Sequence, residues 1–210
     1  MVLVLPLLDR GTMSRRWSFS KSVTGNRAVA EQDIPLFYCP SRRSGVVNPG
    51  IMFESWTKGG NDYGGCIGAC NGFHNCGAHE TWTIAFGRRP GGRCRGVFGV
   101  NSHTRLADVT DGASQTVLIG EVQRLDLGED ATTSRDGWAV GGPSTLFSTC
   151  SDRCDGPNSP FFEEPGSAHR GGVFLGLVDG AVRFINDQID RNVFAAMGSI
   201  GQADGPVSGF

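Results

Sequence analysis

The residues best suited to chemistry lie near the C-terminus, where nine residues separate His169 from the dipeptide Asp179-Gly180. An imidazole and a carboxylate can exchange a proton or share a metal ion. Ten extended residues span about 33 Å, so the two side chains can meet only if the chain doubles back at Gly171-Gly172. We therefore interpret the spacing as a requirement of folding. We expect Asp179 to be a turn residue, and His169 either to hydrogen-bond a neighbouring loop or to act as a ligand.

The sequence on either side of this Asp-Gly dipeptide predicts a β-hairpin. Mostly apolar, β-favouring residues flank the dipeptide on both sides. Asp-Gly suits a two-residue type I′ turn, because both central positions need a positive φ that glycine adopts freely and aspartate tolerates. Pairing Val178 with Ala181 would then place Phe174 opposite Ile185, since side chains alternate with a period of two.

The seven cysteines form a second group of candidates. Most lie in polar, glycine-rich stretches, a pattern that favours loops joined by disulfides in an oxidising compartment. An odd number leaves one thiol over, and Cys39 is a candidate for it. The candidates for disulfides are Cys66, Cys70, Cys76, Cys94, Cys150 and Cys154.

The alternative for part of this group is a zinc site. Its ligands would be Cys66, Cys70, Cys76 and Cys94 with His74 or His79. Intervals of three, five and seventeen residues between the cysteines fit a structural zinc site poorly, because such sites usually combine two close pairs. We therefore favour disulfides, with their connectivity left open.

A loop over residues 150–165 carries four acidic side chains. Paired carboxylates can hold a hard cation such as calcium, although a solvated loop is the simpler interpretation. These weak metal candidates are Asp152, Asp155, Glu163 and Glu164. Trp56, Trp82 and Trp138 could stack on sugars, but we expect them to pack in the core.

The composition and the absence of known motifs reduce the number of possible functional classes. The sequence contains no phosphate-binding loop, nucleophile elbow, zinc-hydrolase helix or EF-hand loop. No acid–base or nucleophile set emerges, so we predict no catalytic residues, no cofactor and no enzymatic activity. A net charge of −2 without a basic stripe argues against nucleic-acid binding.

The length of 210 residues predicts one domain, and the 32 glycines predict many turns and short strands. We expect helix or coil over residues 1–33, an apolar run over 34–41, and mostly loop over 43–80. A single helical turn is expected over 105–112, and a helix from Asp187 or Asp190 to Met197. Strands besides the hairpin are expected at 81–86, 96–100, 116–122 and 137–140.

The first eight residues are apolar but too few to span a membrane, and Pro6 interrupts them. They also lack the basic start and the small-residue cleavage site of a secretory signal. The chain as given therefore has no export signal. Because the cysteines favour an oxidising compartment, we expect a segment upstream of this chain.

Several segments, in chain order, resemble those of a bacterial prepilin-like family whose domain of unknown function carries a His-x9-Asp-Gly motif. The resemblance covers most of the chain. The segments that carry it are Leu5-Pro6-Leu7-Leu8, Phe37-Tyr38-Cys39-Pro40-Ser41-Arg42, Gly96-Val97-Phe98, the block from Leu106 to Glu121 with its Asp-Gly-x-Ser-x-Thr and Gly-Glu elements, and the stretch from His169 to Ile185. The family's prepilin cleavage site and long apolar helix are not in this sequence.

The resemblance implies an α+β, pseudopilin-like fold, with a truncated N-terminal helix and an antiparallel β-rich globular head with short helices. Residues 1–210 would form one domain, in which 1–33 are the remnant of the helical region and 34–210 the head. Motif positions of structural or unknown role would be Asp111, Gly112, Glu121, His169, Gly171, Gly172, Asp179 and Gly180.

The same resemblance implies a non-enzymatic protein of the cell envelope, related to type II secretion or type IV pilus-like assemblies. Its partners would be other pilin-like subunits or envelope proteins. It would lie outside the cytoplasm and reach the membrane only through the missing helix. Two alternatives stay open: an extracytoplasmic carbohydrate- or calcium-binding module that uses the 150–165 loop, and a hydrolase centred on His169.

Overall fold

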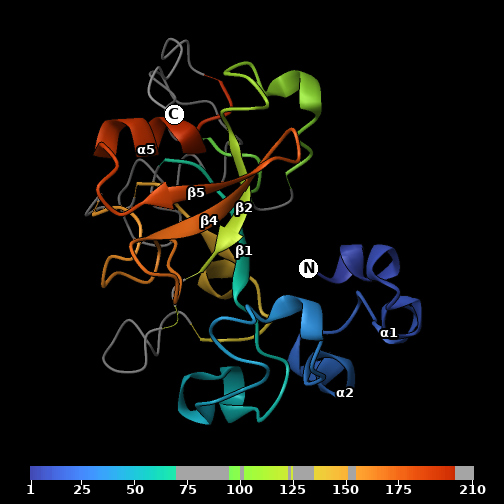
Figure 1. The fold of residues 1–210 in the computed structure, drawn as a ribbon. Coiled ribbons are helices and arrows are strands. Elements are labelled where there is room, and N and C mark those ends of the chain that lie inside the picture. The colour runs from blue at the N-terminus through green and yellow to red at the C-terminus, as the bar shows by residue number, and fades with distance from the viewer. Residues whose placement is uncertain (70–94, 100–101, 123, 125–134, 151–154, 202–210) are drawn as a thin grey trace, which may run out of the picture.

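The computed structural model describes residues 1–69, 95–99, 102–122, 124, 135–150 and 155–201. Its fold is α+β, as predicted, with one five-stranded sheet and several short helices (Figure 1). The strands are β1 (Tyr63–Cys66), β2 (Val117–Glu121), β3 (Leu146–Phe147), β4 (Gly172–Leu177) and β5 (Val182–Asn186), in the order β3-β1-β2-β4-β5. The α-helices are α1 (Gly11–Arg16), α2 (Arg27–Ala30) and α5 (Arg191–Gly198).

Short 3₁₀ helices connect many of these elements. They are η1 (Val2–Leu8), η2 (Thr24–Asn26), η3 (Pro35–Phe37), η4 (Pro49–Ile51), η5 (Phe53–Ser55), η6 (Leu106–Asp108) and η7 (Gly142–Ser144). Their number reflects a sequence rich in glycine and proline, which interrupts longer helices and strands. No helix within the described segments is long and apolar enough to cross a membrane.

The sheet is mixed rather than wholly antiparallel. β1 with β2, β2 with β4 and β4 with β5 pair antiparallel, whereas β3 runs parallel to β1. β1 was expected to be loop, because its sequence Tyr-Gly-Gly-Cys has low β-propensity. A Cβ atom on Gly64 would lie 2.5 Å from Val122 Cγ1 and 3.0 Å from the Thr145 backbone. The absent side chain therefore lets the segments on either side of β1 approach closely.

The predicted hairpin forms, but its register differs by one residue from the expected one. Phe174 pairs with Phe184, not with Ile185. The loop is a three-residue one, closed by a hydrogen bond from the Leu177 N–H to the Ala181 carbonyl. Gly180 alone takes the positive φ, at 89°. A type I turn followed by a left-handed glycine fits this loop better than the expected type I′ turn, so Asp179 needs no positive φ.

The main core lies between the sheet and α5. Its buried members are Cys66, Val117, Val122, Phe147, Val173, Leu175, Leu177, Ile185, Phe194 and Met197. α5 begins as predicted, because the Asp190 carboxylate accepts hydrogen bonds from the N–H groups of Asn192 and Val193. Gly198 is the last helical residue rather than the residue after the helix.

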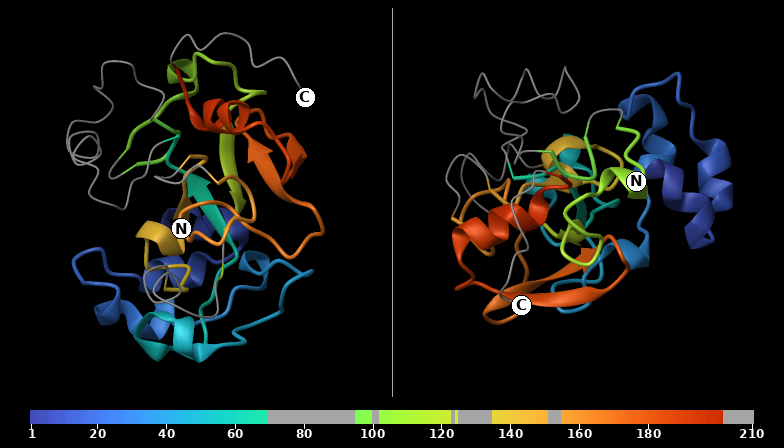
Figure 2. Two further views of the ribbon diagram at one scale, coloured as in Figure 1. Left: turned by 90° about the vertical axis from the view of Figure 1, so that its left-hand side faces the viewer. Right: turned by 90° about the horizontal axis from the view of Figure 1, so that it is seen from above.

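A second core lies under the N-terminal elements. It combines Leu5, Met13, Val29, Ile34, Phe37 and Trp138. α1 and α2 lie at the opposite end of the molecule from α5 in the views of Figures 1 and 2. The helix or coil predicted for residues 1–33 is confirmed.

The other expected elements have mixed outcomes. The strand over 116–122 and the helical turn over 105–112 are confirmed as β2 and η6. Residues 137–140 form a turn instead of a strand. Residues 95–99 are not a strand either, although the Gly96 and Phe98 N–H groups donate to the carbonyls of Ile67 and Cys66. The strand expected at 81–86 lies outside the described residues.

Candidate functional site

Three side chains from distant parts of the chain meet beside the end of β2. The Sγ atom of Cys39 lies 3.7 Å from Nε2 of His169, and Oε1 of Glu121 lies 3.1 Å from the same nitrogen. The three atoms all lie within 4.8 Å of one another. Cys39 and Glu121 are buried, whereas 24% of the His169 side chain is exposed. Solvent therefore reaches this cluster at His169.

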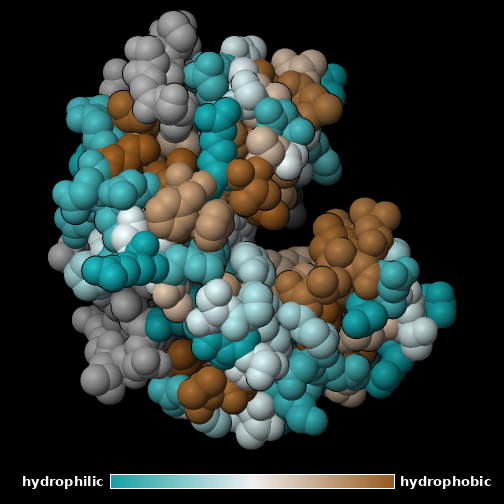
Figure 3. All heavy atoms as spheres, in the orientation of Figure 1, coloured by the Kyte–Doolittle hydropathy of each residue, from teal (hydrophilic) through white to brown (hydrophobic). Residues whose placement is uncertain are grey.

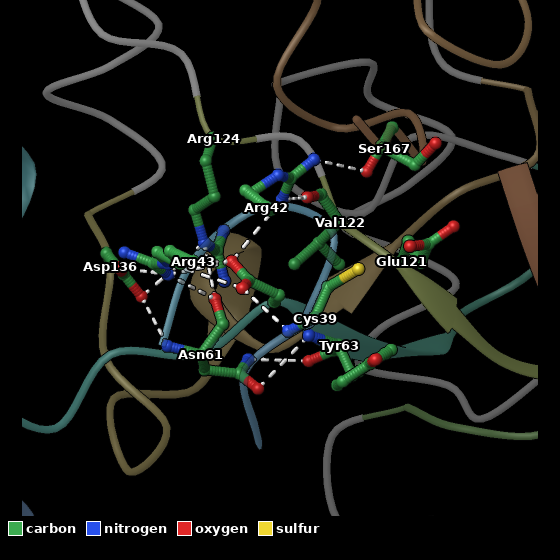
Figure 4. Close-up of polar contacts among 12 residues, drawn as sticks. Cys39, Arg42, Arg43, Asn61, Tyr63, Glu121, Val122, Arg124, Asp136 and Ser167 are labelled. Carbon is green, nitrogen blue, oxygen red and sulfur yellow. Dashed lines mark hydrogen bonds and ion pairs between the residues drawn. The ribbon is translucent and has the colours of Figure 1, made fainter. Parts of the chain in front are cut away.

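Cys39 follows η3 in a loop that buried polar groups hold in place. The Cys39 N–H donates to Oδ2 of Asp62 at 2.9 Å. Asp62 is fully buried and pairs with Arg43, whose Nη2 lies 2.8 Å from Asp62 Oδ1 and 2.6 Å from Asp136 Oδ2. Figure 4 shows Arg43 and Asp136 of this network on one side of Cys39, whose sulfur is directed toward Glu121 on the other side. The network thus fixes the backbone from which Cys39 projects.

Two further arginines extend the network. Arg42 donates to the carbonyl of Val122 at 2.8 Å and to that of Gly166 at 2.9 Å, which links the end of β2 to the segment before His169. Arg124 lies 3.4 Å from Asp136, and burial lowers the pKa of its guanidinium to about 10. Arg42 ends a segment that carries the family resemblance, but no sequence pattern indicated that it or Arg124 would be buried, because burial of charged residues needs tertiary partners.

Glu121 is the last residue of β2, and its two oxygens have different partners. Oε2 accepts a hydrogen bond from the Phe174 N–H at 2.8 Å, across the β2–β4 pair. That contact leaves Oε1 directed at His169. The sheet therefore fixes the carboxylate with one oxygen presented to the cluster.

His169 is positioned by the turn that leads into β4. Its N–H donates to Oγ of Ser167 at 3.0 Å, and its ring packs edge-on against Phe174, with centroids 4.9 Å apart. Gly171 has a φ of 81°. A Cβ atom on Gly172 would overlap the Ile185 carbonyl oxygen, so only glycine lets β5 approach here. The glycine pair thus allows the close turn that sets the His169 backbone.

Tyr63, the first residue of β1, borders the cluster. Burial raises the pKa of its hydroxyl to about 12, and the nearby Cys39 and Glu121 make smaller contributions in the same direction. The hydroxyl therefore stays protonated at neutral pH and adds no charge to the cluster.

The geometry decides which chemistry the cluster fits. In a nucleophile–base–orienter set, one ring nitrogen of histidine faces the nucleophile and the other faces the orienting carboxylate. Here Nε2 faces both Cys39 and Glu121. Sulfur, nitrogen and oxygen donors gathered around one point are instead the ligand types of transition-metal sites. Within the described segments, these three residues form the group of histidine, cysteine and acidic side chains close enough to share an ion.

Asp179 lies in the hairpin loop and takes no part in this cluster. Its carboxylate accepts a hydrogen bond from the Ala181 N–H at 2.9 Å, as expected of a turn residue. Its own N–H donates to the carbonyl of Ala113. Asp111 and Gly112 lie in the turn before β2, where Gly112 has a φ of 105° and its carbonyl accepts from the Thr116 N–H.

The structure corrects the expectation for Cys66. This residue is a free thiol, fully buried in the main core, and burial raises its pKa to about 12. It therefore forms no disulfide, because it packs among the side chains of the sheet and α5. Cys70, Cys76, Cys94 and Cys154 lie outside the described residues, and Cys150 borders them. The pairing of these five stays a prediction.

Several side chains of the acidic loop and two of the tryptophans are buried instead of lying at the surface. Glu163 and Glu164 are fully buried, so the expectation of a solvated loop is wrong for them. Glu164 accepts a hydrogen bond from the Asp155 N–H, and Asp152 lies outside the described residues. Trp56 and Trp138 are buried in the core, as expected, while Trp82 is not described.

The fold and the cluster define an α+β protein with a cysteine–glutamate–histidine site. Comparison with known families shows that residues 1–192 match the family SBP_bac_10, described as Protein of unknown function (DUF1559). The match covers most of the chain, so the protein belongs to this family. No curated protein and no solved structure matches the chain. The expected membership of a family of unknown function is confirmed, and its prepilin-like character stays a prediction.

Proposed function

We propose that the protein is the globular head of a non-enzymatic cell-envelope subunit, related to the pseudopilins of type II secretion or to type IV pilus-like assemblies. One observation carries the non-enzymatic part. Cys39 and Glu121 both meet the same imidazole nitrogen of His169, which is not the arrangement of a nucleophile, a base and its orienting partner. The cluster thus fits a role in holding or binding rather than in turnover.

The surface of η1 supports a role in assembly. Leu3 and Leu7 are 78% and 83% exposed, and Val4 beside them is also exposed. Figure 3 shows a hydrophobic patch over this N-terminal segment. Neighbouring exposed leucines of this kind are typical of surfaces that contact a partner. We assign this patch to contacts with other pilin-like subunits.

Fractionation of the native, full-length product tests the location. The proposal predicts recovery from the envelope fraction, with part of the seven cysteines oxidised. Quantification of free thiols before and after reduction measures that oxidation. Recovery from the cytosol alone, with every thiol reduced, would rule the proposal out.

Crosslinking in cells tests the partner surface. A photocrosslinking residue at Leu7 is expected to capture pilin-like subunits or other envelope proteins. The matched control is the same substitution at Val182, an exposed apolar residue of β5 on another part of the molecule. Equal capture at both positions, or none at Leu7, would count against the assigned surface.

The structure gives less support to the two alternatives, a carbohydrate- or calcium-binding module and a hydrolase centred on His169. Two of the three tryptophans proposed for sugar stacking are buried, and the acidic residues Glu163 and Glu164 are not open to solvent. Calorimetry with calcium and a glycan panel is the direct test of a binding module. A hydrolase centred on His169 would lose all activity in the variant His169→Ala, whereas the proposed role predicts a change in stability or in binding at the cluster.

A further inference from the structure

We propose that Cys39, Glu121 and His169 ligate a transition-metal ion of the zinc class, with a fourth coordination position open toward solvent. The ligand atoms are Sγ, Oε1 and Nε2. The inference goes beyond the proposed function: it concerns the same cluster, but it holds whatever the location and partners of the protein.

The two distances from His169 Nε2 to the other donor atoms are close to those around a tetrahedral ion. Zinc bonds of about 2.3 Å to sulfur and about 2.0–2.2 Å to nitrogen or oxygen place sulfur and nitrogen about 3.6 Å apart, and nitrogen and oxygen about 3.4 Å apart. The corresponding separations here are 3.7 Å between Cys39 and His169, and 3.1 Å between His169 and Glu121. These two pairs therefore need shifts of only a few tenths of an ångström to admit the ion, while the third pair, Sγ of Cys39 and Oε1 of Glu121, lies within 4.8 Å and closes by up to about 1 Å.

Each ligand is also held by a second contact, as ligands of metal sites usually are. The Asp62 carboxylate holds the backbone of Cys39, and the Phe174 N–H binds the far oxygen of Glu121. The ring of His169 packs against that same phenylalanine. The three donors are thus oriented toward one point before any ion arrives.

The donor set selects the class of metal. A thiolate and an imidazole favour zinc and other late transition metals, whereas calcium and magnesium prefer oxygen ligands. A divalent ion would also balance the charges of a buried thiolate and a buried carboxylate, which are costly to bury alone. Calcium is therefore not the expected occupant.

Partial exposure of His169 supplies the route of entry and the open position. The side chain is 24% exposed, while those of the other two ligands are covered by protein. Three protein ligands with a fourth position for water or a small ligand describe an open zinc site rather than a closed structural one. An ion here would join the loop after η3, the end of β2 and the segment before β4.

The test is metal binding by the full chain, purified without a metal-affinity tag and dialysed against a chelator in a phosphine reductant. Zinc affinity is measured by competition with a chromophoric chelator. Cobalt(II) is the second probe, because a cobalt–thiolate bond gives a charge-transfer absorption in the near ultraviolet. The wild type is expected to bind one zinc ion at this site and to show the cobalt–thiolate absorption.

The variants Cys39→Ser, Glu121→Gln and His169→Gln keep the size and most of the hydrogen bonding of each ligand. Each is expected to lower zinc affinity at least about 100-fold, since loss of a mere supporting contact costs 10–100-fold. Cys39→Ser should also abolish the cobalt–thiolate absorption of this site. The matched control His103→Gln, at an exposed histidine, should leave both unchanged.

Thermal unfolding gives an independent readout. Zinc at about 100 times its Kd should raise the Tm of the wild type by about 5–10 °C, and should not raise that of the three ligand variants. Circular dichroism of the metal-free variants verifies that they fold. The inference is overturned if folded ligand variants bind zinc as tightly as the wild type, or if the cobalt–thiolate absorption is absent or is as strong in Cys39→Ser as in the wild type.

Discussion

The Nε2 atom of His169 lies 3.1 Å from Oε1 of Glu121, although the two residues are far apart in sequence. This contact joins the end of β2 to the turn before β4. Phe174 reinforces it, because its N–H binds Glu121 and its ring packs against His169. Folding of the sheet and formation of the cluster are therefore coupled.

The glycines of the hairpin give a first prediction. Gly172→Ala should destabilise the protein by about 2 kcal/mol or more, because the new methyl group overlaps the Ile185 carbonyl oxygen. Gly180→Ala should cost about 1–2 kcal/mol, because its φ of 89° is unfavourable for alanine although the surrounding space is open. Gly45→Ala, with no atom near the new methyl group, is the control and should be nearly neutral. Urea unfolding measures all three, and equal costs at Gly172 and Gly45 would contradict the register described.

The buried ion network gives a second prediction. Arg43→Ala should lower the free energy of unfolding by about 3–5 kcal/mol, because it leaves Asp62 and Asp136 with one fewer buried cation. It should also increase the reactivity of Cys39 toward alkylating reagents, since Asp62 holds that backbone. Arg27→Ala is the control, because its ion pair with Glu31 is exposed and its loss should change stability little. Similar free energies of unfolding for the two variants would show that the buried network stabilises the protein no more than an exposed ion pair does.

The pKa of Cys66 gives a third prediction, for alkaline pH. Burial raises this pKa from 9.0 to about 12, so the thiol ionises more easily in the unfolded chain than in the folded one. Its contribution to stability is therefore complete below about pH 9 and is lost as the pH rises from 9 toward 12. The loss should approach about 1.4 kcal/mol per pH unit well above pH 9 and level off near pH 12.

The matched variant for this effect is Cys66→Ala. It should be less stable than the wild type at neutral pH because of the cavity it leaves, but its stability should fall less steeply above pH 9. Urea unfolding at several pH values under reducing conditions measures both slopes. An unchanged alkaline slope would show that Cys66 is not the group responsible.

Local sequence patterns account for the elements that could be predicted. β2, the hairpin and α5 each have a local signal: a run of β-branched residues, an Asp-Gly turn, and an aspartate cap before an apolar helical face. The hairpin register was missed because Asp-Gly suits both a two-residue and a three-residue loop. β1 was missed because its glycines serve close packing of neighbouring segments, which no local pattern reveals.

The cluster itself depended on tertiary structure. Cys39, Glu121 and His169 each lie in a segment that the resemblance singled out, yet no spacing in the sequence indicates that they meet. The residue that the sequence spacing pairs with His169 is Asp179, which is nearer along the chain and lies in the hairpin loop, away from the cluster. The histidine's partners come from the loop after η3 and the end of β2, and only the sheet brings these together.

A double-mutant cycle between Glu121 and His169 tests most directly the claim that this histidine joins distant segments. Glu121→Gln, His169→Gln and the double variant are compared with the wild type by urea unfolding of the metal-free protein. The 3.1 Å contact predicts a coupling free energy of about 1 kcal/mol or more. Additive effects, with a coupling free energy near zero, would contradict the account.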